Sequence, residues 1–328
     1  MIVSKTPFRV SLAGGGSDFA EYYHQRPGRV VTAAIDRHMY VTVNRRFDDS
    51  LRVSYTRTEI VDHVDALQHD LIREALKMTG IVSGVEVTTI ADLPAGIGLG
   101  SSSTLTVGVL NALYAFKGEW HSAADLAERA CHIEIERLGR PIGKQDQYIA
   151  AFGGLQDIRF NPDDTVAVQP VVSTPAVRER LRRRLLLFFT GMQRDAGDVL
   201  AEARRRLGSS EESRAHVDGL VAIADRVRQA LAEGRIDGLG RCLDVSWQLK
   251  KRMASGVTNG TLDDFYGLAR EAGADGGKVS GAGGGGCLLL FARPAARRAV
   301  RASMRDAGLR EVPFGLDPEG SRIIHYSA

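Results

Sequence analysis

The chain has few cysteines and no long apolar run. Its three cysteines, Cys131, Cys242 and Cys287, are far apart in a sequence of 328 residues, which predicts neither a disulfide framework nor a zinc site. No apolar run approaches the roughly 20 residues that cross a bilayer. Lys5 and Arg9 interrupt the early apolar residues, so we expect no signal peptide, no membrane partner and a cytoplasmic location.

The chain also lacks a strong charge of either sign. It has 43 Lys and Arg against 40 Asp and Glu, a net charge of +3, which is too small to indicate nucleic-acid binding. The densest basic run, residues 178–184, is interpreted as a solvated helix face. The length suits one large domain or two ordinary ones. We expect a monomer or homodimer that binds small molecules.

Glycine is plentiful and gathers in three clusters, at residues 14–16, 96–100 and 281–286. The middle cluster joins a strand-like run, 85–90, to a helix-like run, 105–116. Such a turn, ending in serines, suits a phosphate, because the first N–H groups of a helix have no internal partner and carry partial positive charge. Its spacing matches neither the Walker loop nor the dinucleotide fingerprint. A structural turn with serine caps is the alternative.

The first cluster follows an apolar strand over residues 8–13 and precedes Ser17 and Asp18. Three glycines in a row leave an open space beside the backbone, and a carboxylate at its edge can accept hydrogen bonds from the hydroxyls of a polyol. Asp18 could instead, or also, cap a helix over 19–25. The third cluster leads into a buried strand over 287–291, which predicts tight backbone packing rather than a hinge.

Strand-like and helix-like segments follow one another without regular βαβ alternation, and this predicts an α+β fold. Further strands are expected over 30–43, 51–55, 185–189, 310–314 and 322–326. Further helices are expected over 64–78, 122–138, 195–254 with breaks at 208–210 and 233–234, 262–271 and 294–306. The composition shifts after residue 164, which favours a boundary near 165–185. We therefore divide the chain into domains 1–175 and 176–328.

In this order the three segments resemble the signature motifs of the GHMP kinases, the superfamily of galactokinase, homoserine kinase, mevalonate kinase and phosphomevalonate kinase. Motif one corresponds to residues 7–14 and motif three to 278–286. Motif two, P-x-x-x-G-L-G-S-S, matches residues 94–102 without gaps. More narrowly, residues 13–18, 144–148 and 277–286 are similar to the D-glycero-D-manno-heptose 7-phosphate kinases. The resemblance implies an N-terminal domain like ribosomal protein S5 domain 2 and a ferredoxin-like C-terminal domain.

The resemblance also implies roles for the motif residues. Asp146 corresponds to the catalytic aspartate, which accepts or orients the proton of the attacking hydroxyl, although alone it would be read as a surface-turn residue. Arg9 corresponds to the motif-one cation that neutralises charge as the phosphoryl group moves. Ser102 and Glu134 would hold Mg²⁺, which needs few protein oxygens, with Glu136 as the alternative carboxylate.

ATP and the sugar would bind at the glycine clusters. The expected ATP-binding residues are Pro94, Gly96, Gly98, Leu99, Gly100, Ser101, Ser102 and Ser103. The expected sugar-binding residues are Gly14, Gly15, Gly16, Ser17, Asp18, Asp146, Gly283 and Gly284. Galactokinases carry glutamate and histidine where this chain has Gly15 and Gly16, which argues against galactose and for a larger or phosphorylated sugar.

The implied reaction is ATP-dependent phosphorylation of the anomeric C1 hydroxyl of D-glycero-D-manno-heptose 7-phosphate, in nucleotide-activated heptose synthesis for surface polysaccharide. Candidates for the sugar phosphate are Lys144, Arg194 and the arginines at 182–184; His24 and His132 are expected to be structural. The alternatives are a fucokinase-like or sedoheptulose 7-phosphate kinase, a non-catalytic sugar sensor, and an S5-like RNA-binding protein.

Overall fold

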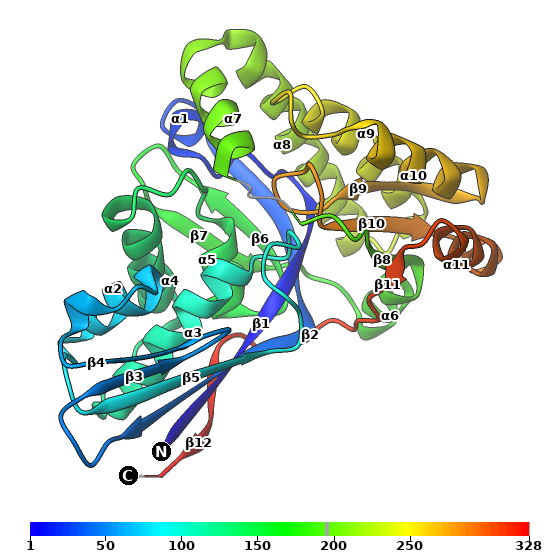
Figure 1. The fold of residues 1–328 in the computed structure, drawn as a ribbon. Coiled ribbons are helices and arrows are strands. Elements are labelled where there is room, and N and C mark those ends of the chain that lie inside the picture. Colours follow the sequence, from blue (N-terminus) through cyan, green and yellow to red (C-terminus); the bar gives the residue numbers. More distant parts are fainter. Residues whose placement is uncertain (194–196, 328) are drawn as a thin grey trace.

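The computed structural model describes residues 1–193 and 197–327, and these residues form two β-sheets with helices packed on both (Figure 1). The first sheet has the order β12-β1-β2-β5-β3-β4, with β6 and β7 extending it from β2; the second has the order β11-β8-β10-β9. The strands are β1 Ile2–Ala13, β2 Gly28–Arg45, β3 Leu51–Ser54, β4 Thr58–Val61, β5 Val85–Ala91, β6 Leu155–Phe160, β7 Val166–Pro170, β8 Leu185–Phe189, β9 Ala274–Val279, β10 Cys287–Ala292, β11 Arg310–Glu311 and β12 Arg322–Tyr326.

The helices cover both sheets. They are α1 Ala20–Tyr23, α2 Asp70–Thr79, α3 Ser101–Phe116, α4 Ala123–Cys131, α5 Gln145–Phe152, α6 Pro175–Arg184, α7 Gly197–Ser209, α8 Glu211–Ala232, α9 Leu239–Lys250, α10 Gly260–Glu271 and α11 Arg297–Asp306, with a π-helix at His132–Arg137 and 3₁₀ turns at Val64–Ala66 and Ile236–Gly238. The α+β prediction is confirmed, and the second sheet has the strand order expected of a ferredoxin-like domain. None of the helices described is long and apolar enough to cross a membrane.

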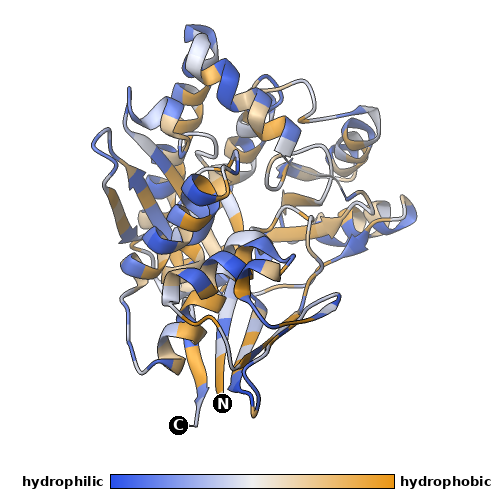
Figure 2. Ribbon diagram, turned by 60° about the vertical axis from the view of Figure 1, so that its left-hand side comes forward, coloured by the Kyte–Doolittle hydropathy of each residue, from blue (hydrophilic) through white to orange (hydrophobic). Residues whose placement is uncertain are grey.

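The core runs from one sheet into the other. The helix α3 packs on β1 and β2, α8 also contacts both of these strands, and α9 packs on β9. One buried cluster therefore includes Leu12 of β1, Val227 of α8 and Phe291 of β10. Figure 2 shows the apolar residues concentrated on the strands and the polar residues on the outer faces of the helices. This shared core holds the two halves of the chain around a common cleft.

The C-terminal strand does not follow the expected division of the chain. The chain leaves the first sheet after β7 and enters the second at β8, but β12 returns to pair with β1 in the first sheet. The two termini are adjacent, with the amino group of Met1 donating to the carbonyl of Ser327 at 2.6 Å. Residues 322–326 thus cover the edge of β1. The division at residue 175 stays a prediction.

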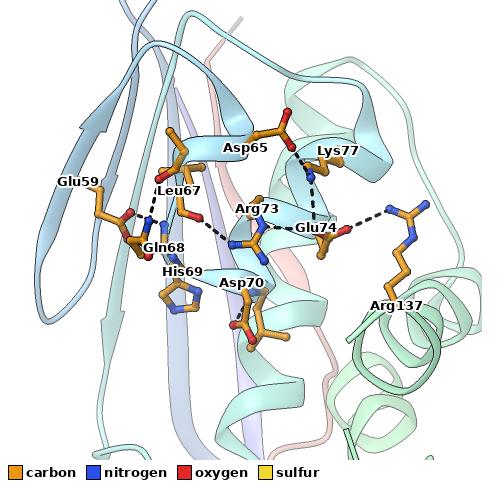
Figure 3. A network of polar contacts seen from close by, with 12 residues as sticks. Glu59, Asp65, Leu67, Gln68, His69, Asp70, Arg73, Glu74, Lys77 and Arg137 are labelled. Carbon is orange, nitrogen blue, oxygen red and sulfur yellow. Dashed lines mark hydrogen bonds and ion pairs between the residues drawn. The ribbon is translucent and has the colours of Figure 1, made fainter. Parts of the chain in front are cut away.

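The helix expected over 64–78 begins only at Asp70. The carboxylate of Glu59 on β4 accepts hydrogen bonds from the backbone N–H groups of Gln68 at 2.6 Å and His69 at 3.1 Å, as Figure 3 shows. These two amides therefore stay outside the helix. The carboxylate of Asp70 in turn accepts from the N–H of Leu71 at 2.7 Å, at the first turn of α2.

The helix expected over 122–138 has two parts. Ser122 and Asp125 form the capping box that the sequence predicts. After Cys131 the chain widens into the π-helix, a form that in proteins often marks a functional site. Here the π-helix turns the side chain of Glu134 toward Ser102.

Candidate active site

A cavity of about 1380 Å³ lies between the two halves of the chain. Its wall is made by β1, the three glycine clusters, the first turns of α3 and α5, and helices α7 to α9. Single-ligand pockets usually measure about 300–1,000 Å³. The cavity therefore has room for two ligands side by side.

The middle glycine cluster opens directly into helix α3. Gly96, Gly98 and Gly100 have φ angles of +77°, +78° and +81°, which favour glycine. The helix begins at Ser101, four residues earlier than expected, and its N-cap Gly100 provides no side-chain cap. The first N–H groups of α3 thus have no intrahelical partner, and all three serines line the cavity. This is the geometry of an anion site.

The middle and third clusters interlock. A Cβ on Gly98 would stand 2.6 Å from the carbonyl oxygen of Ser280, and one on Gly281 would stand 2.7 Å from the Cα of Gly98. The N–H of Cys287 donates to the carbonyl of Ile97 at 3.0 Å. The third cluster is therefore a close backbone contact, as the sequence predicts, and it supports the loop that precedes α3.

Arg9 and Asp146 form a bidentate ion pair in the wall of the cavity. Arg9 Nε donates to Oδ1 and Nη2 to Oδ2 of Asp146, both at 2.7 Å, while Nη1 donates to the carbonyl of Gly98 at 2.7 Å. Asp146 lies in the first turn of α5 rather than in a surface turn. A Cβ on Gly100 would be 3.2 Å from Asp146 Oδ2. The carboxylate therefore adjoins the loop that precedes α3.

Asp18 does not cap the helix that follows it. Helix α1 has Phe19 as its N-cap, without a side-chain hydrogen bond. Asp18 Oδ1 accepts from the N–H of Gly16 at 2.9 Å, and Oδ2 from the N–H of Gln145, the first residue of α5, at 3.2 Å. Burial, and then the charge of Asp146, raise the pKa of Asp18. Asp18 thus joins the first glycine cluster to the helix that carries Asp146.

The open space expected beside the first cluster exists only at Gly15. A Cβ there would have Ser11 Oγ at 3.9 Å as its one neighbour within 4 Å. A Cβ on Gly14 would instead stand 1.9 Å from the carbonyl oxygen of Arg29, and one on Gly16 would stand 2.4 Å from Met253 Cε. Gly14 is therefore needed for the approach to β2, and Gly15 alone widens the pocket.

Three residues expected in the site do not line the cavity. The hydroxyl of Ser17 is buried and donates to the carbonyls of Gly14 and Arg29. Leu99 is buried in the core, and the N–H of Gly284 donates to the carbonyl of Val257 at 2.7 Å. These three residues hold the glycine-rich loops in their conformation. The other expected ATP- and sugar-binding residues do line it: Pro94, Gly96, Gly98, Gly100, Ser101, Ser102, Ser103, Gly14, Gly15, Gly16, Asp18, Asp146 and Gly283.

Glu134 lies beneath α3 and is fully buried. It accepts a short hydrogen bond from Ser102 Oγ and another from Gln147 Nε2 at 3.1 Å, and burial raises its pKa. Glu136 faces outward and pairs with His132 at 2.7 Å. A carboxylate beside a hydroxyl is an oxygen donor set of the kind that Mg²⁺ prefers, so Ser102 and Glu134 fit this ion.

Arg140 is a neighbour of this pair that the sequence did not indicate. Its Nη1 donates to Ser102 Oγ at 2.7 Å and lies 3.8 Å from Glu134 Oε2, and its Nη2 bonds both carboxylate oxygens of Asp70. Because like charges repel, a metal ion bound by Ser102 and Glu134 would have to share these two residues with the guanidinium of Arg140 or displace it.

The cations expected to bind a sugar phosphate lie elsewhere. Lys144 pairs with Asp164 at 2.9 Å and lies over the ring of Tyr23, outside the cavity wall. The arginines at 182–184 are on α6 and pair with Glu179 and Asp237. His24 and His132 pair with surface carboxylates, and Arg194 lies outside the described residues.

Two lysines missed by the sequence analysis line the cavity instead, Lys250 at the end of α9 and Lys278 on β9. Lys278 is 4% exposed. Burial, and then the charge of Arg9, lower its pKa to about 7. The third motif contains Lys278, which was the available signal, whereas Lys250 lies in an ordinary amphipathic helix.

Comparison with known proteins agrees with this geometry. The profile of the GHMP kinases N terminal domain matches residues 65–154, and that of the GHMP kinases C terminal region matches residues 227–309. The D-glycero-alpha-D-manno-heptose 7-phosphate kinase of Campylobacter jejuni is 31% identical over an alignment that covers 97% of both chains. The galactokinase of Pyrococcus furiosus is 28% identical over 94% of this chain and 93% of its own.

Solved structures agree as well. The D-glycero-D-manno-heptose 1-phosphate kinase of Bacteroides thetaiotaomicron superposes over 100% of both chains with a TM-score of 0.84 and 25% identity. A putative sugar kinase of Campylobacter jejuni covers 98% of this chain and 97% of its own, with a TM-score of 0.79 and 29% identity.

Proposed function

The chain belongs to the GHMP kinases, as a sugar kinase that transfers a phosphoryl group to an alcohol, and from this premise we propose that it phosphorylates the anomeric C1 hydroxyl of D-glycero-D-manno-heptose 7-phosphate with ATP. The observation that carries the proposal is the place of Asp146. Its carboxylate adjoins the loop at 96–100, and Asp18 accepts a hydrogen bond from the N–H of Gln145, the residue before Asp146. The product would be the 1,7-bisphosphate, for nucleotide-activated heptose synthesis.

The nucleotide would occupy the loop at 96–103. The free N–H groups at the start of α3, with the hydroxyls of Ser101 to Ser103, would hold its phosphates. Ser102 and Glu134 would hold Mg²⁺, which when bound neutralises charge on the phosphate oxygens. The interlocked third cluster would keep this loop in place.

The sugar would lie between Asp18 and Asp146. Asp146 would accept the proton of the anomeric hydroxyl while the sugar oxygen bonds to the γ-phosphorus. The bond from that phosphorus to the β-phosphate oxygen breaks, and ADP leaves without a phosphoenzyme. Arg9 would orient Asp146 through two guanidinium nitrogens. Its positive charge would offset the negative charge of the γ-phosphoryl group as that group moves.

The choice of sugar rests on the relatives and on Gly15. The two heptose kinases compared with this chain are named for different phosphate positions, so the site of phosphorylation has to be measured. An ADP-release assay should be run with heptose 7-phosphate, heptose, galactose, fucose and sedoheptulose 7-phosphate, and phosphorus NMR should locate the new ester. Preference for heptose 7-phosphate with a C1 ester supports the proposal. Preference for an unphosphorylated hexose sinks it.

Replacement of Asp146 by Asn separates a kinase from a sugar sensor. Asn has nearly the same size but accepts no proton, so kcat should fall by about 10²–10⁴-fold, while ATP still binds. Turnover close to wild type would show that Asp146 has another role. Tight binding of sugar and ATP to the unaltered protein without turnover would favour the sensor.

A further inference from the structure

One wall of the cavity carries three pairs of side chains that share a pattern. Three elements, β1, α9 and the end of β9, each present one cation and one hydroxyl on the same face. The spacing is two residues on a strand or four on a helix, which puts both members of a pair on one side. The pairs are Arg9 with Ser11, Lys250 with Ser246, and Lys278 with Ser280, and all six residues line the cavity.

Three hydroxyl groups on this wall have no hydrogen-bond partner in the part of the chain that the structure describes. The hydroxyls of Ser11, Ser246 and Ser280 are buried and make no hydrogen bond among the described residues. Lys278 is buried beside them, 4% exposed, and is within the electrostatic influence of the like charge of Arg9. Buried polar groups are nearly always satisfied, so three such exceptions at one wall, beside a buried lysine, indicate a missing ligand.

The charge of the wall identifies the chemistry of that ligand. Lys250 donates to the carbonyls of Val279 and Gly281. Its ammonium lies within the electrostatic influence of Lys278 and Arg9, and also of Asp146 and Asp18. Arg9 already pairs with Asp146, so it is the two neighbouring lysines, Lys250 and Lys278, whose charges favour an anion. A phosphate group offers several acceptor oxygens to ammonium and hydroxyl donors at once.

The wall lies between the two predicted substrate sites. Ser280 touches the loop that precedes α3, since a Cβ on Gly98 would stand 2.6 Å from its carbonyl oxygen. Ser11 Oγ lies 3.9 Å from the position of a Cβ on Gly15 in the first cluster. A phosphate on either substrate could therefore reach the wall.

We propose that Lys278, with Lys250 and the hydroxyls of Ser11, Ser246 and Ser280, forms a second phosphate-binding site, separate from the N-terminus of α3. It takes either the phosphate of the acceptor sugar or the γ-phosphate of the nucleotide. The first of these two sources rests on the proposed function; the second requires only a kinase.

Calorimetric titration of wild type and Lys278→Met distinguishes the sources. Comparison of heptose 7-phosphate with heptose isolates the acceptor phosphate, and comparison of the β,γ-imido analogue of ATP with ADP isolates the γ-phosphate. We expect the affinity gained from one of these phosphates to fall at least tenfold in the variant. Lys251→Met is the matched control, because Lys251 directly follows Lys250 of the wall but pairs with Asp263 outside the cavity. Both affinity ratios should be unchanged in this control.

A second variant and a third probe keep the test independent of the sugar. Ser280→Ala removes one unpartnered hydroxyl without a change of charge, and the same ratio should fall by a smaller factor. Inorganic phosphate titrated into the ADP complex probes the site without any sugar. If heptose 7-phosphate fails to bind the wild-type protein, the proposed function is wrong. The titrations with nucleotide and inorganic phosphate then still test the second phosphate-binding site. The proposed site is overturned if Lys278→Met weakens the binding of none of the three probes, which are the acceptor phosphate, the γ-phosphate and inorganic phosphate.

Discussion

Replacing Lys278 by methionine should make the ligand-free protein more stable at low pH. Burial lowers the pKa of this lysine from 10.5 to about 7 in the folded chain. Between these two values the unfolded chain binds a proton that the folded chain has released, so the free energy of unfolding of the wild type rises with pH across this window. Below pH 7 the folded protein buries the charge and carries the full cost.

The size of the effect follows from the same two pKa values. Each unit of pKa corresponds to about 1.4 kcal/mol, so burial of the charged Lys278 costs the wild type at most about 5 kcal/mol at pH 6. Methionine fills a similar volume without charge. The variant should therefore gain about 2–5 kcal/mol at pH 6, and the gain should shrink steadily as the pH approaches 10.

Urea unfolding at a series of pH values from 6 to 10 measures this gain, since the midpoint changes with stability while the slope stays constant. The control is Lys251→Met, at the residue that follows α9, which should change stability by no more than about 0.5 kcal/mol. A Lys278→Met protein that is less stable than wild type at pH 6, or whose gain does not change with pH, would refute the reasoning. The ammonium would then be satisfied within the ligand-free protein.

Three further changes test the rest of the site. Gly98→Ala should raise the KM for ATP at least tenfold and lower the urea midpoint, because its Cβ would meet the Ser280 carbonyl. Gly96 has a similar φ but open space around it, so Gly96→Ala is the control and should cost only about 1 kcal/mol of backbone strain. Equal effects of the two substitutions would contradict the interlocked loops. Glu134→Gln should weaken Mn²⁺ binding to the ADP complex by about 10–100-fold, as measured by electron paramagnetic resonance, and unchanged affinity would remove Glu134 from the metal site. Arg9→Lys replaces a planar fork by a point charge, so kcat should fall about 100-fold, or ~2.7 kcal/mol, in the ADP-release assay; wild-type turnover would show that the bidentate pair is dispensable.

The glycine motifs were readable from the sequence because their geometry is local. Positive φ angles at 96, 98 and 100 require glycine, and a helix that starts among serines leaves its first amides free. The role expected of Asp146 did not follow from local signals and came from the resemblance to the GHMP kinases. The capping box at Ser122 was equally visible, since both of its partners lie within four residues.

Several elements could not be found this way. Strand β7 is mostly half-exposed and lacks a clear alternation, and β9 contains two glycines, so neither has the pattern of a strand. The start of α2 depends on Glu59, which lies nine residues before Gln68 and takes its N–H. The partner of Asp18 is the N–H of Gln145, 127 residues away. Each of these is decided by a contact that sequence spacing does not encode.

The sequence by itself determined the family and the glycine-rich loops, because those depend on residue type and local backbone conformation. The proposed roles of Asp146 and Arg9 came from the resemblance to that family. Only the tertiary structure decided which groups face one another. It placed Glu134, and not Glu136, beside Ser102 by way of a π-helix. It joined Asp18 to the first residue of α5 instead of the N-terminus of α1, and it brought Lys250 and Lys278 into the wall of the cavity. Burial and the proximity of charge give those lysines their chemistry, and both arise only when distant segments pack together.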